Sequence, residues 1–169
     1  HVSNVLGSIL DGRRAAEIAH RQGALLLLDG CQAVPRLPVH VAAIGADFYA
    51  FSGHKLYGPT GIGCLWGRYD LLNALPPWQG GGSMIDRVTF EQTTYLDAPM
   101  RFEAGTPHIV GTVGLHAAID WTSGLTLDAI HAHECALVAE TRSALSSIDG
   151  VTGCAMSRAT AAAALDTSR

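Results

Sequence analysis

A short apolar run, Ala24 to Leu28, constrains the fold of this chain more than any other segment. The run stops abruptly at Asp29 and is far too short for a membrane span, which needs about 20 apolar residues. A continuous apolar run of this length is typical of a strand that is buried on both faces. Such a strand needs a covering layer on each side, so the chain is expected to fold in layers.

Strand and helix patterns alternate along the rest of the chain. Helix 12–22 is expected to bury Ala15, Ile18 and Ala19 on one face and to end before Gly23. No clear pattern extends over residues 88–101. The alternation predicts an α/β layered architecture. The other expected segments are a short one at 42–45, strands at 47–51 and 62–66, and helices at 69–74, 112–123 and 127–148.

Composition narrows the class of protein. The 169 residues are 48% hydrophobic and 15% charged, which favours a folded core over disorder. The formal net charge is −4, and no basic run is present, so we expect neither a nucleic-acid partner nor a membrane partner. The four cysteines show no paired spacing and are expected to be reduced, which predicts a soluble, cytoplasmic protein.

Polar groups follow two of the expected strands. Asp29 ends the first strand, and the string Ser52-Gly53-His54-Lys55 ends the second. Ligands of open α/β sheets bind beyond the carboxyl ends of strands, so both groups could face one crevice. A desolvated lysine has a lowered pKa and forms a Schiff base readily, and an aspartate could keep a pyridine nitrogen protonated. Equally, Asp and Ser-Gly are ordinary turn residues, and this alternative stays open.

Several strings in this chain together resemble the class V aminotransferase family, and within it the cysteine desulfurase and selenocysteine lyase branch. The resemblance extends from His1 to about Ile148. Asp-x-x-Gln upstream of Ser-Gly-His-Lys is its most specific part. The strings are His1-Val2-Ser3-Asn4, Asp29-Gly30-Cys31-Gln32-Ala33, Phe51-Ser52-Gly53-His54-Lys55-Leu56-Tyr57-Gly58-Pro59, Gly80-Gly81-Gly82-Ser83-Met84-Ile85 and Arg101-Phe102-Glu103-Ala104-Gly105-Thr106-Pro107.

The resemblance implies a cofactor, pyridoxal 5′-phosphate, and a role for each matching residue. Lys55 would hold the cofactor and move the proton at the substrate Cα. Asp29 would pair with the pyridine nitrogen, and Gln32 would contact the ring hydroxyl. Asn4 would lie beside the cofactor and the substrate carboxylate. The phosphate would be bound by Ser52 and His54, and by Thr106 across the interface of a homodimer.

The same resemblance implies the reaction. The parent enzyme would convert L-cysteine to L-alanine and pass sulfur to an acceptor protein as a persulfide, commonly for iron–sulfur cluster assembly. A selenocysteine lyase or another enzyme of the family, such as a kynureninase-like hydrolase, is the first alternative. The second is a truncated, catalytically inactive chain that binds a partner or misfolds.

Relative to the family pattern, the chain is expected to be an internal fragment. Residues 1–125 would form part of the large, cofactor-binding domain of a fold-type I transferase, with a mixed, mainly parallel sheet flanked by helices. Residues 126–150 would form a helix leading toward a C-terminal domain, and residues 151–169 remain an unassigned tail. The family's stacking histidine, phosphate-binding turn, carboxylate-binding arginine and persulfide cysteine have no counterpart here.

The four cysteines are not expected to carry the sulfur. Cys31 and Cys64 are interpreted as packing residues. His131 and Cys135 could share a helix face, but two ligands do not make a zinc site, so no metal is predicted. Cys154 follows Thr-Gly as the family's acceptor cysteine does, yet without the two intervening histidines. An abnormal C-terminus explains that departure better than a functional acceptor.

Overall fold

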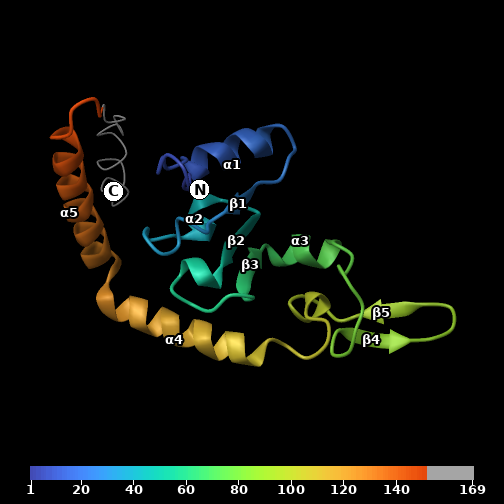
Figure 1. Ribbon diagram of the computed structural model, residues 1–169. Helices are drawn as coiled ribbons and strands as arrows, with labels where there is room; N and C mark the ends of the chain where they lie inside the picture. Colours follow the sequence, from blue (N-terminus) through green and yellow to red (C-terminus); the bar gives the residue numbers. More distant parts are fainter. Residues whose placement is uncertain (152–169) are drawn as a thin grey trace.

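The computed structural model describes residues 1–151 (Figure 1). Helices and strands alternate through the first half of the chain, as the sequence predicts, and two longer helices end it. In chain order the elements are α1 (Gly12–Arg21), β1 (Leu27–Asp29), α2 (Val41–Ile44), β2 (Phe48–Ser52), η1 (Gly53–Lys55), β3 (Gly63–Gly67), α3 (Tyr69–Ala74), β4 (Ile85–Val88), β5 (Thr93–Tyr95), η2 (Met100–Phe102), α4 (Ile109–Leu125) and α5 (Leu127–Ser146).

The central sheet has the strand order β1-β2-β3 and is mixed. β1 and β2 run parallel, with Asp29 opposite Ala50. β2 and β3 run antiparallel, with Ser52 opposite Gly63. The carboxyl ends of β1 and β2 therefore meet at one edge of the sheet, which brings the polar groups that follow them into one region.

The core of the sheet lies where α1 and α2 pack together. Leu28, Ala46 and Tyr49 form its buried centre. A Cβ atom on Gly12 would lie only 2.9 Å from Ile44 Cγ2, so the missing side chain lets α1 approach this core closely.

Two expectations about burial are wrong. In α1, Gly12 and Ala16 are the buried residues, whereas Ile18 is 48% exposed, because the helix faces the core through its glycine side. In β1, Leu28 is buried but Leu27 is 56% exposed, because successive strand residues point to opposite faces and the described residues cover only one of them. β1 is thus buried on one face within residues 1–151.

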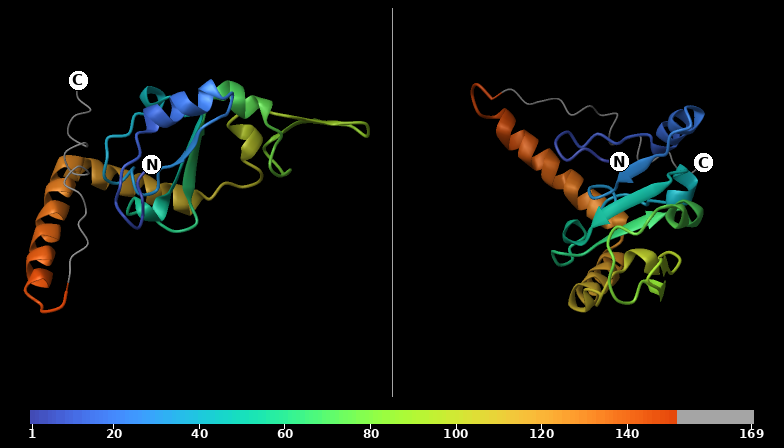
Figure 2. Two further views of the ribbon diagram at one scale, coloured as in Figure 1. Left: turned by 90° about the horizontal axis from the view of Figure 1, so that it is seen from above. Right: turned by 90° about the vertical axis from the view of Figure 1, so that its right-hand side faces the viewer.

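The second half of the chain extends away from the sheet. Helix α3 has the predicted bounds, and α4 is longer than predicted at both ends. Residues 88–101, for which the sequence shows no clear pattern, contain the tip of the β4–β5 hairpin, strand β5 and the start of η2. Within this hairpin, the Thr94 hydroxyl donates a hydrogen bond to Asp86 Oδ2 at 2.9 Å. The hairpin and α5 project at opposite ends of the molecule (Figure 2). None of the helices within residues 1–151 is long and apolar enough to cross a membrane.

Candidate active site

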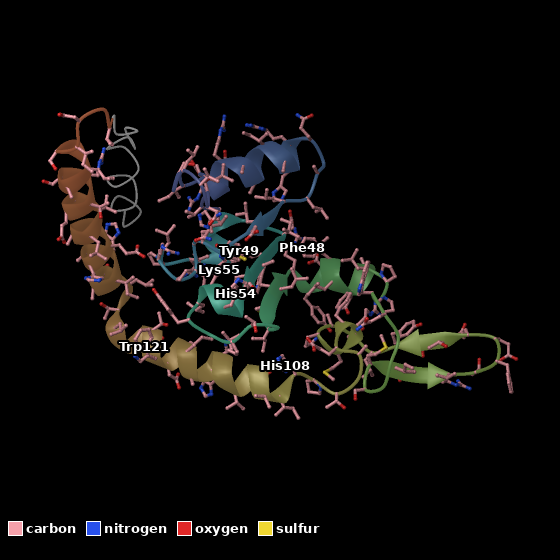
Figure 3. All side chains as sticks on the ribbon, in the orientation of Figure 1. Phe48, Tyr49, His54, Lys55, His108 and Trp121 are labelled. Atoms are coloured by element: carbon pink, nitrogen blue, oxygen red, sulfur yellow. The ribbon has the colours of Figure 1, made fainter. Side chains whose placement is uncertain are left out.

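Lys55 lies at the end of a tight turn that directly continues β2 (Figure 3). The turn begins at Gly53, whose N–H donates to the Ile62 carbonyl at 2.8 Å. A Cβ atom at position 53 would lie 2.9 Å from the Ile62 Cγ2 atom, so the turn fits against the start of β3 only with glycine there. The Gly53 carbonyl in turn accepts from the N–H groups of Leu56 and Gly58 at 2.9 and 3.0 Å. Lys55 is therefore held on a closely hydrogen-bonded backbone.

The loop that follows Lys55 rests on α4. Tyr57, which has a positive φ of 58°, packs edge-on against Trp121, with ring centroids 5.5 Å apart. Gly114 of α4 leaves room for the ring of Pro59, to which a Cβ atom would approach within 3.0 Å. Helix α4 thus supports the backbone of the lysine loop through contacts with residues that lie more than 50 positions away.

Asp29 stands at the carboxyl end of the neighbouring strand. Its Oδ1 atom accepts a hydrogen bond from the Cys31 N–H at 2.9 Å. The hydrogen bonds from the Cys31 backbone and thiol lower the pKa of Asp29 below its usual value. The carboxylate is therefore firmly ionised near neutral pH, as a partner for a protonated ring nitrogen must be.

Tyr49 lies on β2 behind Asp29 and is 2% exposed. Its hydroxyl pairs with His1 Nδ1 at 2.9 Å, and the two rings are nearly perpendicular. Burial, followed by the negative charge of Asp29, raises the pKa of Tyr49 to about 12. The Tyr49 phenol is therefore neutral at physiological pH. It packs as a buried side chain beside the site and adds no charge to it.

Gln32 and Asn4 meet although 28 residues separate them. Gln32 Nε2 donates to Asn4 Oδ1 at 2.9 Å. On its other side, Gln32 Oε1 accepts from Arg36 Nη1 at 3.3 Å. The two amides predicted to contact the cofactor are therefore joined directly, and Arg36, which sequence reasoning missed, fixes the orientation of one of them.

Ser52 and His54 also form a pair, with Ser52 Oγ and His54 Nδ1 2.9 Å apart. They flank the lysine turn and could together present hydrogen-bond donors to an anion. The expectation that Lys55 is desolvated is wrong for residues 1–151, because its side chain is exposed there, and His54 is exposed as well.

Thr106 is the predicted residue that stands apart. It lies between η2 and α4, is exposed, and shares no hydrogen bond with the other predicted site residues in the described part of the chain. Its proposed place is opposite a second subunit, so a single chain is not expected to bring it to Lys55. The structure therefore gathers the other predicted site residues, namely Asn4, Asp29, Gln32, Ser52, His54 and Lys55, around the ends of β1 and β2.

The cysteines differ from one another in exposure. Cys31 is partly buried, as a packing residue can be, whereas Cys64 is exposed, so the prediction that it packs is wrong for the described residues. His131 Nε2 and Cys135 Sγ share a face of α5 at 3.6 Å. Residues 1–151 contain no group of three or more side chains that could hold a metal ion. Cys154 and nearly all of the unassigned tail lie outside the described residues.

Comparison with known proteins identifies the family to which this sequence is similar. A model of the aminotransferase class-V family matches residues 1–166. A cysteine desulfurase of Dickeya dadantii is 57% identical over 134 residues, which cover 79% of this chain and 32% of that protein. The crystal structure of the cysteine desulfurase CsdA from Escherichia coli has a TM-score of 0.83 and 42% identity, covering 88% of this chain and 37% of that one.

A more distant likeness has the same mixed α/β arrangement. The complex between the cystine C-S lyase C-DES and its product cysteine persulfide has a TM-score of 0.63 and 28% identity, and covers 72% of this chain. The chain spans about a third of the length of the first two proteins, 32% and 37% respectively.

Proposed function

The chain belongs to the aminotransferase class-V family, and from this membership we propose that it is part of a pyridoxal-phosphate-dependent cysteine desulfurase. The family membership and the mixed α/β fold predicted from the sequence motifs are both confirmed. The observation that carries the proposal is the meeting of an ionised Asp29 and the Lys55 turn at the ends of two parallel strands.

The residues present fit the cofactor. Asp29 offers a carboxylate to the ring nitrogen, Gln32 offers an amide N–H to the ring hydroxyl, and Lys55 offers a primary amine to the aldehyde. Pyridoxal phosphate, when bound, withdraws electrons from the substrate Cα and Cβ. Gly30 allows the backbone beside Asp29 to pack directly against the Tyr49 ring, because a Cβ atom at position 30 would lie 2.0 Å from that ring.

The chain's own residues would bind and orient the substrate and move one proton. Asn4 would hold the substrate carboxylate, and the Lys55 amine would take the proton from Cα and return a proton to the product. Overall, L-cysteine and an acceptor thiol would yield L-alanine and an acceptor persulfide, so sulfur is transferred and no external oxidant is needed. The relatives named cysteine desulfurase support this choice of substrate.

The wider setting is part of the same proposal. We place residues 1–125 in the large domain and residues 126–150 in a helix that leads toward a further domain. A homodimer would bring Thr106 to the partner's phosphate site, and the persulfide would pass to an acceptor protein that serves iron–sulfur cluster assembly. The free cysteines Cys31, Cys64 and Cys135 are typical of a reducing compartment, which supports a cytoplasmic location.

Substitution of Lys55 tests the proposal. Addition of pyridoxal phosphate to the purified protein is expected to produce the absorbance band of the lysine-bound cofactor, and Lys55→Ala is expected to abolish that band because Lys55 is the only lysine in the 169 residues. The exposed Arg14→Met variant, which lies outside the site, serves as the control. A band that persists in Lys55→Ala, or that never forms, contradicts the assignment.

The substrate needs a separate measurement. The complete polypeptide that contains this sequence is supplied with L-cysteine, L-selenocysteine or L-kynurenine, and the products are quantified. Alanine with persulfide from cysteine supports a desulfurase. Preference for selenocysteine or kynurenine would instead support the alternative enzymes of this family.

A further inference from the structure

Arg36 connects two parts of the molecule that are distant in the sequence. Its Nη1 atom donates to Gln32 Oε1 at 3.3 Å and to the Gln32 carbonyl at 3.4 Å. Its Nε atom donates to Glu134 Oε1 at 3.1 Å, across 98 positions of sequence. One guanidinium therefore reaches both a residue of the proposed cofactor site and the helix α5.

The guanidinium determines which way the Gln32 amide faces. Arginine has only donors, so the atom of the amide that it meets must be the oxygen. The Nε2 group then points the other way, where one of its N–H bonds goes to Asn4 Oδ1 at 2.9 Å. A second N–H remains for another acceptor. Without Arg36, the amide could rotate and present its oxygen to the site instead.

Glu134 holds Arg36 in place from α5. Within residues 1–151, this contact is the only side-chain hydrogen bond or ion pair that joins α5 to a residue that precedes α4. Helix α5 otherwise turns away from the sheet at the end of α4 (Figure 1). The Arg36 and Glu134 side chains are 41% and 37% exposed, so the pair is partly shielded from solvent.

We propose that Arg36 and Glu134 are positioning residues that keep the Gln32 amide N–H directed at the ring hydroxyl oxygen of pyridoxal phosphate. The inference rests on the proposed function. Through this pair, the position of α5 affects the hydrogen bonding of the cofactor although α5 itself contributes no residue to the site.

The first test needs no cofactor. The side-chain amide signals of Gln32 are recorded by NMR and assigned from their loss in Gln32→Ala. Arg36→Met, which keeps an unbranched stem, is expected to move both signals toward the values of an exposed amide, and Glu134→Ala to move them less in the same direction. The double variant is expected to match Arg36→Met, because Glu134 acts only through Arg36. Arg14→Met, which removes the exposed 3.1 Å pair with Glu17, should leave the signals unchanged.

The second test uses the absorbance of the bound cofactor as a function of pH. In the loaded protein, one proton would be shared by the ring oxygen and the Lys55 nitrogen that holds the cofactor. A hydrogen-bond donor to the ring oxygen lowers the pKa of this proton. Loss of the donor is therefore expected to raise the pH at the midpoint of the absorbance titration. A shift of about one pH unit in Arg36→Met corresponds to one hydrogen bond. Arg36→Lys, which keeps a donor and a charge, is expected to restore part of the shift.

The outcomes separate the two proposals. A Lys55-dependent band with unchanged amide signals and midpoint in Arg36→Met overturns the positioning role and leaves the proposed function standing. Amide signals that depend on Arg36 without any cofactor band overturn the proposed function instead. If Arg36→Met does not fold, the Glu134→Ala variant on the surface of α5 tests the positioning role instead. Unchanged Gln32 amide signals and an unchanged titration midpoint in Glu134→Ala would then overturn the inference.

Discussion

At the scale of single residues, the site depends on a glycine and an aromatic ring that share one space. Gly30 follows Asp29 directly and donates its N–H to the Ala50 carbonyl at 2.7 Å. A Cβ atom on Gly30 would lie 2.0 Å from Tyr49 Cε1 and 2.5 Å from the Tyr49 hydroxyl oxygen. Because Tyr49 is buried, it has little room to move away. The backbone beside Asp29 therefore fits only while residue 30 has no side chain.

Gly30→Ala is expected to destabilise the chain by about 1–3 kcal/mol, the usual cost of forcing an extra methyl group into a packed site. Urea or thermal unfolding measures the loss. Gly124→Ala is the matched control, because a Cβ atom at position 124 meets nothing within 4 Å and alanine favours the helix there. Equal stability of the two variants would contradict the close packing of Gly30 on Tyr49.

At the scale of elements, one buried carboxylate next to β2 holds three other parts of the fold together, namely α1, the start of β1 and the end of β3. Asp47 is fully buried beside β2. It accepts from the Leu26 N–H at 2.8 Å and pairs with His20 Nε2 of α1 at 2.7 Å. Arg68, which follows β3, donates to it at 3.2 Å. Burial alone would raise the pKa of Asp47, but these three partners outweigh it and lower the pKa below the ordinary value of 3.8.

Asp47→Asn is expected to lower the unfolding free energy at neutral pH by about 2–4 kcal/mol, because the buried carboxylate that pairs with Arg68 and hydrogen-bonds to His20 is lost. The folded pKa is lower than the unfolded one, so the stabilisation is complete above pH 4 or so and is lost as pH falls below it. Unfolding measured between pH 7 and pH 3 should show a smaller pH dependence in the variant.

Asp70→Asn supplies the control for this experiment. Asp70 pairs with the same arginine at 2.7 Å, but its side chain is 63% exposed. Exposed ion pairs contribute little to stability, so the loss should be much smaller than for Asp47→Asn. Similar losses in the two variants would mean that burial of Asp47 does not matter.

At the scale of the whole molecule, large apolar side chains lie on the surface of the described residues. They do not gather in one element but occur in the N-terminal turn, the loop after α3, the hairpin tip and α4. Exposed apolar surface of this extent is typical of interfaces with other protein segments. The most exposed are Val5 at 86%, Trp78 at 90%, Phe90 at 108% and Val110 at 81%.

The 169-residue chain alone is therefore expected to release little or no alanine and sulfide from L-cysteine. The motifs that this sequence shares with the family are expected to include neither the persulfide cysteine nor the carboxylate-binding arginine, and the chain spans about a third of the length of the two cysteine desulfurases compared above. The assay compares the chain with the complete polypeptide, in which activity is expected. A normal enzymatic rate from the chain alone would refute the expectation.

The sequence by itself determined the order of the main helices and strands outside the β4–β5 region, and it identified the polar groups at the strand ends. Helix α3 and the core of α1, β2 and β3 follow from local periodicity, because apolar spacing and turn residues act over a few positions. Lys55 and Asp29 were identified from motifs for the same reason: Asp29 ends β1, and Lys55 ends the short turn that continues β2.

Only the tertiary structure decided which distant residues meet. Nothing in the local pattern near Gln32 indicates that Arg36 pairs with Glu134, or that α4 supports the loop after Lys55. Burial was also decided there, since Leu27, Ile18 and Lys55 are exposed although local pattern predicted otherwise. Periodicity reports which residues share a face of an element, whereas the neighbours of that face depend on how the whole chain packs.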